Sequence, residues 1–582
     1  MSTQASFRLA VRRLRKSPGF TLLAVSVLAI GIGLNASVFS FVSSFLLRPL
    51  PVDAPDRLAH LYTWEETGPT SHSPLAFPDF EDLRAMDSFD DVLAHSMGAV
   101  ALDDGARQEL VFAALASGNY FPLLGVEPAL GRAFTVDEAT RGSGARVAVL
   151  SHSAWRTRFG GDEAALGRTL RINGETVTII GVAPPEFSGL VRGIGPELWL
   201  PMSLVPDLGI GSVTNSGDPT PGLDRLQDRA QRWHWATARL RDGVSFEQAE
   251  AELSTAAAAL EAAHPDTNED RSFVLVPARD VRVLPGADQA LFAGSFLLMG
   301  IVGLVLLIAC ANLANMLLVR AAGRRQEMAT RVALGASRWQ LSGQLLAESL
   351  LLSVLGGAAG LGLAAMSNRW LSTLELPVPI PIELGLTIDG RVLGFTLGAS
   401  IATALFFGLL PALQTPRAQL SAGLRESARG SSGGRTAHRL RATLVVGQVT
   451  LSLVLTIAAV LAVRSLQSAG QIDPGFEPEG VVAAVVAPGL QGSDETAAAQ
   501  FFDRLRERLD AQPGVVAASD ASHLPLTLSM SVARVAAPEQ AGGDPETWPL
   551  ADHQSVSPGY FEALGIELQY GRGFSRTDTA DA

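Results

Sequence analysis

Residues 117–139 read SGNYFPLLGVEPALGRAFTVDEA, and residues 557–579 read SPGYFEALGIELQYGRGFSRTDT. The two stretches align without a gap at an offset of 440 and share Tyr-Phe, Leu-Gly and Gly-Arg-x-Phe. Each follows an apolar stretch of membrane-spanning length, so the repeated unit is a membrane anchor joined to an external domain. The sequence therefore predicts a tandem duplication. Because the second motif lies just before Ala582, we expect the second repeat to be truncated here, with three further spans to follow in a longer chain.

Membrane-spanning segments are indicated by five stretches that contain no Asp, Glu, Lys or Arg: 20–47, 289–319, 349–368, 392–416 and 442–463. Each reaches the roughly 20 residues needed to cross a hydrocarbon core about 30 Å thick. The first is too long for the apolar part of a cleavable signal peptide, which has about 7–15 residues. We therefore expect five spans.

Basic residues set the expected orientation. The segments 1–19, 320–345 and 414–441 carry net charges of +5, +4 and +5, whereas the whole chain carries −13. All three lie on one side if the five stretches span, and the positive-inside rule makes that side cytoplasmic. The remaining chain is strongly acidic and lies outside, which argues against nucleic-acid binding.

The external segments have a mixed α/β pattern. The sequence predicts a helix over 77–93, a strand and helix over 146–159, and a hairpin around Asn173-Gly174. A long helix is expected to end at Pro265. In the second external segment we expect strands over 481–488 and 515–520 on either side of a helix. The fold class is thus a membrane α-helical bundle with α+β extracytoplasmic domains.

Two sequence features indicate helix contacts. The loop between the second and third spans has charges at Arg324, Glu327 and Arg331 with helical spacing, followed by Ala333-Leu334-Gly335-Ala336. Such a segment could dock in a groove of a cytoplasmic partner, or it could be an ordinary basic loop. Gly356 and Gly360 form a Gly-x-x-x-Gly pattern that could bring the third span close to another helix. Asn35, Asn312, Asn315 and Gln448 are expected to join helices rather than to line a path, because none is ionisable.

Catalytic and cofactor motifs are missing from the sequence. Lys16 is the only lysine and follows Arg15, so there is no Gly-Lys of a Walker A motif. The chain has one cysteine, Cys310, and no His-x-x-x-His pair, so we expect no metal site and no cofactor. The protein is therefore not expected to be an enzyme, and nucleotide hydrolysis would need another subunit.

The run from Ser17 to Leu58 resembles the first span of MacB/FtsX-type ABC transporter permeases. SGNYFPLLGVEPALGRAF, AVLSHSAWRTRFGGDEAALGRTLRINGETVTIIGVAPPEFSG and VSFEQAEAEL resemble their MacB-like periplasmic core domain. RRQEMATRVALGASRWQLSGQLLAESLLLSVLGGAAGLGLA is similar to the FtsX-like permease signature. The second anchor and domain resemble the duplicated, orphan permeases typical of acidobacteria.

This resemblance implies a segment order: a cytoplasmic amphipathic N-terminus (1–19), span 1 (20–47), a first periplasmic core domain (48–288) and an FtsX-like permease domain (289–416). A cytoplasmic linker (417–441), span 5 (442–463) and a partial second core domain (464–582) follow. The coupling loop is 320–345. By resemblance, the residues that contact the ATPase are Arg324, Arg325, Glu327, Arg331, Gly335 and Ala336.

The resemblance also implies a function. We expect a multi-pass bacterial inner-membrane permease subunit that couples a separate cytoplasmic ABC ATPase to export or extraction of an envelope substrate. Membrane lipid is a further expected partner, and a periplasmic adaptor or an outer-membrane component is another. The alternative is a regulator that passes ATPase motion to an external enzyme such as a cell-wall hydrolase. The large external domain favours the transporter.

Overall fold

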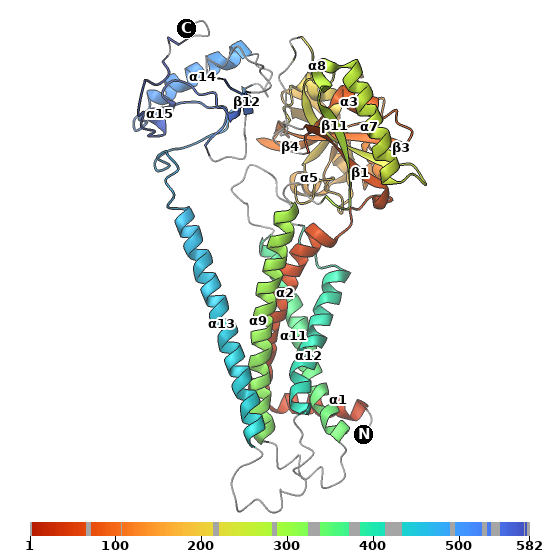
Figure 1. Cartoon of the computed structure of the whole chain (residues 1–582), viewed down its shortest axis with the longest axis vertical. Coiled ribbons are helices and arrows are strands. Elements are labelled where there is room, and N and C mark those ends of the chain that lie inside the picture. The colour runs from red at the N-terminus through yellow and green to blue at the C-terminus, as the bar shows by residue number, and fades with distance from the viewer. Residues whose placement is uncertain are drawn as a thin grey trace, which may run out of the picture.

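The computed structural model describes residues 3–65, 72–105, 107–212, 220, 222–281, 288–323, 338–371, 385–413, 434–488, 495–525, 532–536, 548–575 and 577–578. Figure 1 shows long helices that run together, with two external regions at the end opposite to the N-terminus. The predicted class, a helical membrane bundle with a mixed α/β external domain, is confirmed.

The bundle consists of long apolar helices and one short basic helix, α1. They are α1 (Thr3–Lys16), α2 (Pro18–Val42) continued by the π-helical η1 (Ser43–Leu47), α9 (Asp288–Gly323), α11 (Arg338–Leu371), α12 (Gly390–Leu413) and α13 (Gly434–Ala469). Four of the described segments are long and apolar enough to cross a membrane: Pro18–Leu47, Asp288–Leu317, Leu346–Leu371 and Ala442–Ala469. A shorter apolar segment, Gly390–Phe406, lies in α12. Each predicted span therefore overlaps a helix.

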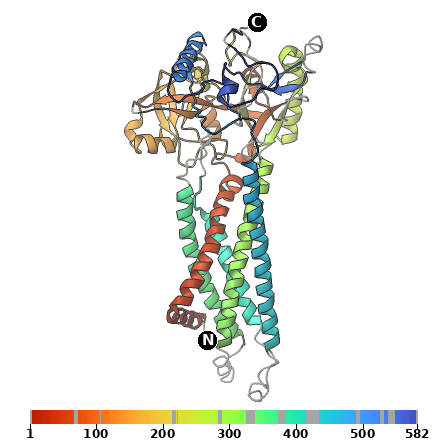
Figure 2. The ribbon, with the colours of Figure 1, turned by 90° about the vertical axis from the view of Figure 1, so that its left-hand side faces the viewer.

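The membrane helices extend beyond the apolar stretches that predicted them. At 1.5 Å per residue, the 36 residues of α9 reach about 54 Å, which is longer than a hydrocarbon core of about 30 Å. Figure 1 shows α9 and α2 running up to the external domain. Figure 2 shows α1 lying across the base of the bundle, crosswise to α2.

The first external domain is built on an 11-stranded mixed sheet with the order β11-β1-β10-β3-β4-β9-β6-β8-β5, while β2 pairs with β10 and β7 with β3 and β8. Among the strand pairs that the structure describes in this sheet, only β4–β9 and β6–β8 are parallel. The strands are β1 (Leu58–Glu65), β2 (Leu75–Ala76), β3 (Phe89–Asp103), β4 (Gln108–Ala116), β5 (Leu130–Gly131), β6 (Val147–Leu150), β7 (Thr169–Ile172), β8 (Glu175–Val182), β9 (Leu198–Pro201), β10 (Arg232–Leu240) and β11 (Arg271–Pro277).

Short helices connect these strands: α3 (Phe77–Leu83), α4 (Tyr120–Leu124), α5 (His152–Phe159), α6 (Val205–Leu208), α7 (Phe246–Ala263) and α8 (Pro265–Asn268), with 3₁₀ turns η2 (Pro55–Arg57), η3 (Glu163–Ala165) and η4 (Met202–Leu204). Helix α7 begins at a capping box in which Ser245 and Gln248 bond each other's backbone N–H groups. Apolar side chains form two buried clusters, one around Trp233 and Phe80 and one around Trp199 and Phe121.

Two local predictions have different outcomes. The hairpin at Asn173-Gly174 is confirmed, since β7 and β8 pair around these residues, which have φ of 51° and 84°. The helix predicted over 77–93 is too long: α3 ends at Leu83, and Phe89 begins β3. Because Phe89, Val92 and Leu93 are buried within the sheet, pairing of β3 with β10 overrides the local helical pattern.

The second external region contains α14 (Glu495–Asp510), α15 (Tyr560–Ala563) and the paired strands β12 (Val532–Arg534) and β13 (Leu550–Asp552). The predicted helix is confirmed as α14. The strands predicted over 481–488 and 515–520 are not formed in the part of this region that the structure describes. Val482 is 93% exposed and Val516 is 89% exposed, so neither side chain packs against a second layer that would stabilise a strand.

The repeated sequence adopts the same local structure twice. Tyr120 and Tyr560 each begin a short helix that is followed by a left-handed glycine, at φ 68° for Gly125 and 64° for Gly565. Arg132 holds Glu138 through two hydrogen bonds of 2.7 Å, and Arg572 holds Asp578 through bonds of 2.6 and 2.7 Å.

The strand contact before this motif is also repeated. The Ser117 Oγ accepts from the backbone N–H of Ala94 at 2.9 Å, and the Ser557 Oγ accepts from that of Asp520 at 2.9 Å. The bridge between Ala521 and Val556 has the same position relative to its serine as the pair His95–Ala116 in the first domain. The second copy thus keeps one bridge and the serine contact where the first copy has the paired strands β3 and β4, and in both copies a short helix follows.

Candidate functional site

The predicted coupling residues Arg324, Arg325, Glu327, Arg331, Gly335 and Ala336 lie in the segment 324–337, outside the described residues. The helices on both sides are described: α9 ends at Gly323 and α11 begins at Arg338. The geometry of the candidate site is therefore that of the helices around this loop.

At the end of the bundle where α1 lies, three helices meet at Arg320. The Arg320 guanidinium donates to the Oγ of Ser17, at the junction of α1 and α2, and lies 4.4 Å from the centre of the Phe20 ring. It also forms an ion pair of 3.8 Å with Glu348 of α11, whose side chain is only 4% exposed. A largely buried charge pair of this kind costs several kcal/mol when one partner is removed. These contacts hold α2, α9 and α11 together on both sides of the loop.

Gly356 and Gly360 lie on the face of α11 that contacts α2. A Cβ on Gly360 would lie 2.9 Å from the backbone nitrogen of Gly33, and a Cβ on Gly33 would lie 2.8 Å from the carbonyl oxygen of Gly360. A Cβ on Gly356 would meet Leu28. The two helices therefore approach until their backbones touch, which only residues without a side chain permit.

Asn35 joins span 1 to span 2. Its side-chain nitrogen donates to the carbonyl of Gly31 at 2.8 Å and to that of Val302 in α9 at 2.7 Å. An amide buried in an apolar bundle needs such acceptors. The other three polar residues expected to join helices, Asn312, Asn315 and Gln448, lie in α9 and α13 and are half-buried.

A second junction lies at the external end of the bundle. Arg48, just after η1, donates to the hydroxyl of Thr387 at 2.7 Å and pairs with Asp389 at 3.2 Å. Burial acts to raise the pKa of Asp389, but hydrogen bonds from the backbone of Val392 and from Arg48 lower it overall. Arg391 donates to the carbonyl of Leu47. These contacts bind the top of span 1 to the start of α12.

The same turn of span 1 contacts the external domain. The Phe45 ring lies where a Cβ on Gly193 would be, and the Arg192 side chain donates to the Phe45 carbonyl at 3.1 Å. Gly193 has φ 76°, so the loop after β8 turns around the ring in a conformation that favours glycine. The external domain therefore sits directly on η1.

Sequence reasoning missed this external junction. Its partners lie far apart in the chain, and the pairing of Arg48 with Asp389 spans 341 residues. One signal was available: an arginine just after span 1 and an aspartate just before span 4 mark the same side of the membrane, with opposite charges.

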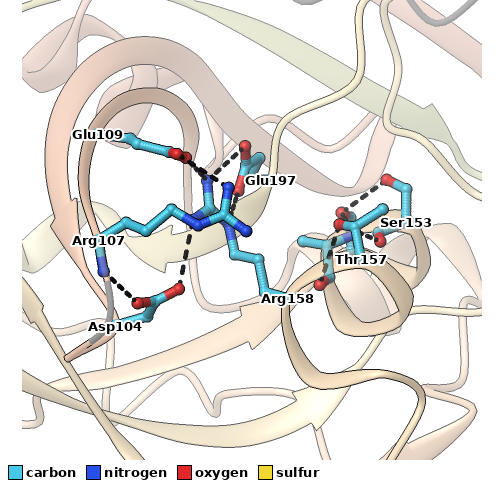
Figure 3. Close-up of polar contacts among 9 residues, drawn as sticks. Asp104, Arg107, Glu109, Ser153, Thr157, Arg158 and Glu197 are labelled. Carbon is cyan, nitrogen blue, oxygen red and sulfur yellow. Dashed lines mark hydrogen bonds and ion pairs between the residues drawn. The ribbon is translucent and has the colours of Figure 1, made fainter. Parts of the chain in front are cut away.

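The most strongly paired charge in the external domain is Arg158 of α5 (Figure 3), which is 10% exposed and contacts Asp104, Glu109 and Glu197. Hydrogen bonding to Glu197, followed by that to Glu109, raises the pKa of Arg158, while Arg158 lowers the pKa of Glu109. Arg158 and Glu109 therefore stay ionised at neutral pH. The ion pairs tie α5 to β4 and to the start of β9.

Three buried histidines also lack a chemical role. Burial lowers the pKa of His60 to about 4, of His95 to about 3 and of His234 to about 4. His60 bonds Thr237 at 2.9 Å, and the other two pack against aromatic rings. Among the described residues, no three His, Cys, Asp or Glu side chains gather as metal ligands. The candidate site is thus a set of helix junctions.

Comparison with known proteins identifies two domains. A profile of the MacB-like periplasmic core domain matches residues 21–256, and a profile of the FtsX-like permease C-terminal matches residues 299–420. A macrolide export ATP-binding/permease protein MacB from Salmonella paratyphi A is 26% identical over 313 residues, covering 52% of this chain and 41% of that protein. Its counterpart from Bradyrhizobium diazoefficiens is 27% identical and covers 50% of this chain and 40% of that protein.

The chain thus matches about two fifths of the length of these curated relatives. Among solved structures, the periplasmic region of MacB from Actinobacillus actinomycetemcomitans has a TM-score of 0.29 at 17% identity, covering 41% of this chain and 94% of that one. The extracellular domain of the noncanonic ABC-type transporter YknZ from Gram-positive bacteria has a TM-score of 0.28 at 17% identity, covering 37% and 99%.

Proposed function

We propose a function from the premise that this chain belongs to the MacB/FtsX-type permeases, inner-membrane proteins with periplasmic domains. It is the permease subunit of an ABC-type transporter. It passes motion from a separate cytoplasmic ATPase to its external domains, and this motion exports or extracts an envelope substrate. A periplasmic adaptor or an outer-membrane component would complete the path.

One observation carries this proposal: α2 is bonded at both ends and along its middle. At its base Ser17 and Phe20 contact Arg320 of α9, which in turn pairs with Glu348 of α11 on the other side of the predicted coupling loop. In the middle its backbone touches α11 at Gly33 and Gly360. At the top, Phe45 fits against Gly193 of the external domain. A displacement at the loop would therefore reach the external domain through one rigid helix, since packed elements move as units.

ATP binding would act through the loop residues Arg324, Arg325, Glu327 and Arg331, together with Gly335 and Ala336. Charge-assisted hydrogen bonds from such side chains contribute about 1.5–3 kcal/mol each when desolvated. We expect Arg324→Glu plus Arg331→Glu to abolish co-purification of the ATPase and substrate export. The matched control is Arg435→Glu plus Arg439→Glu, which makes the same charge change in another cytoplasmic segment.

The experiment is affinity purification of the full-length protein in a non-denaturing detergent, with mass spectrometry of the bound ATPase. Normal insertion of both variants is checked by protease protection of the external domain. If the loop variant inserts normally and retains its ATPase as the control does, the coupling assignment is wrong.

We also propose that residues 464–582 are part of a second core domain in a tandem duplication, and that the segment boundaries follow the order expected from the sequence. The repeated Arg132–Glu138 and Arg572–Asp578 pairs and the repeated serine contacts support this proposal. Topology tests it: on a Cys310→Ser background, a cysteine at position 430 should resist a membrane-impermeant reagent, whereas one at 558 should react. Labelling at 430 in intact, outer-membrane-permeabilised cells would refute it.

A further inference from the structure

Helix α1 is amphipathic, but the protein covers only part of its apolar face. Phe7, Ala10, Val11 and Leu14 have the i, i+3, i+4, i+7 spacing of one helix face. Ala10 and Leu14 are buried, whereas Phe7 is 51% exposed on the same face. Leu14 packs in a cluster with Leu313 of α9 and Leu352 of α11. The C-terminal half of α1 is therefore fixed to the bundle, and its N-terminal half projects beyond it.

The rest of α1 carries only positive charge. Arg8, Arg12, Arg13, Arg15 and Lys16 lie within it, and the first acidic residue of the chain is Asp53, beyond span 1. Arg8, Arg12 and Arg15 are exposed and form no ion pair with any residue that the structure describes. Because α1 has five basic residues and no acidic one, none of its own side chains can neutralise its positive charge.

The position of α1 fixes its surroundings. Figure 2 shows it crosswise at the base of the bundle, and it ends at Lys16, just before the charge-free stretch of span 1 begins at Phe20. Its last turn is bonded to the bundle because Ser17, which follows α1, accepts from Arg320. A helix at this depth has its apolar face toward acyl chains and its basic side chains at the headgroups.

We propose that α1 is a binding surface for the anionic glycerophospholipid headgroups of the cytoplasmic leaflet. Arg8, Arg12 and Arg15 supply the positive charge, and Phe7 enters the acyl boundary. Bound lipid holds α1 against α9 and α11, which Leu14 contacts through Leu313 and Leu352. The inference rests on the inner-membrane location and not on the proposed ATPase, so either can fail alone.

Electrostatics sets the expected size of the effect. Each basic residue near an anionic membrane surface strengthens binding roughly five-fold. Arg8→Gln plus Arg12→Gln plus Arg15→Gln should therefore weaken binding about ten- to a hundred-fold, and less in high salt because the charges are screened. Glutamine has a helix propensity close to that of arginine, so α1 should remain helical.

The experiment uses the full chain in detergent, with a fluorophore on Gln4→Cys in a Cys310→Ser background. The protein is titrated with phosphatidylglycerol or phosphatidylcholine carrying brominated acyl chains, which quench the fluorophore on contact. We expect phosphatidylglycerol to quench at a much lower concentration than phosphatidylcholine. The triple variant should lose this preference, while the charge-matched control Arg435→Gln plus Arg439→Gln plus Arg441→Gln should retain it.

Three outcomes would overturn the proposal. One is equal quenching by the two lipids, which leaves only the ordinary positive-inside signal. Another is a triple variant that keeps the preference. The third is a fluorophore that phosphatidylglycerol does not quench but that becomes shielded when the co-purifying ATPase is added, which assigns the basic face to a protein partner.

Discussion

Replacement of Gly360 by alanine tests the close contact between α2 and α11. The new Cβ would lie 2.9 Å from the nitrogen of Gly33 and 3.0 Å from the carbonyl oxygen of Ala29, whereas an ordinary contact is 3.4–4 Å. The helices must therefore separate by about 0.5 Å along their interface, and overpacking of this kind costs about 1–3 kcal/mol.

Gly362 provides the matched control because its Cβ would have no atom within 4 Å. Both substitutions gain the same helix propensity, about 1 kcal/mol for glycine to alanine, so this contribution cancels in the comparison. We expect Gly360→Ala to be less stable than Gly362→Ala by about 1–3 kcal/mol. Gly33→Ala should behave like Gly360→Ala, and the double change should cost less than the two single changes together, because one separation relieves both clashes.

The assay is unfolding of the full chain in mixed micelles by increasing fractions of sodium dodecyl sulfate, followed by helix content and by protease resistance of the spans. The two single variants are compared at their transition midpoints. If Gly360→Ala and Gly362→Ala unfold at the same midpoint, the backbones of α2 and α11 do not come as close as the structure shows. In that case α2 would not be the rigid link that the proposed function requires.

Three further predictions concern stability. Arg158→Met should destabilise the external domain by about 3 kcal/mol, because it leaves Glu197, Glu109 and Asp104 without their cation. The control Arg156→Met, on the exposed side of α5, should change the stability little. The proteolysis rates of the two variants measure this difference. The pKa values of His60 and His234 fall to about 4 from 6.5, so the unfolded chain binds protons that the native domain does not. The free energy of unfolding should therefore be highest above pH 6.5 and fall as the pH drops toward 4. At pH 5 the loss should be roughly 2 kcal/mol per histidine. A denaturation midpoint that does not change between pH 7 and 5 would contradict this prediction. Asn35→Leu should weaken the contact of α2 with α9 by about 1 kcal/mol, which cysteine cross-linking between the two helices can measure.

Features that depend on local chain chemistry were predictable from the sequence. The spans follow from apolar length, the hairpin from Asn173-Gly174 and the helix α7 from its periodicity and Pro265. Gly356 and Gly360 lie on the face of α11 that contacts α2. In each case the deciding residues are neighbours in the chain.

Features that depend on distant partners were not predictable. Helix α3 stops at Leu83 because the residues after it pair in a sheet whose next strand, β10, begins at Arg232. The junctions of Arg320 with Glu348 and of Arg48 with Asp389 arise only once the helices are packed. A single sequence contains the charges of such pairs but not the proximity that joins them.

The double hydrogen bond of Asn35 has a consequence for the time course of synthesis. The two residues that it joins, Asn35 and Val302, are 267 positions apart, and the external domain is made between them. At about 5–20 residues per second, ribosomes need roughly 15–50 s to reach the second partner. Until then the amide can rely on Gly31 of its own helix, 2.8 Å away, so the first span can enter the bilayer alone. The hydrogen bond that joins it to α9 forms only when the second span arrives, after the chain of the external domain has been made.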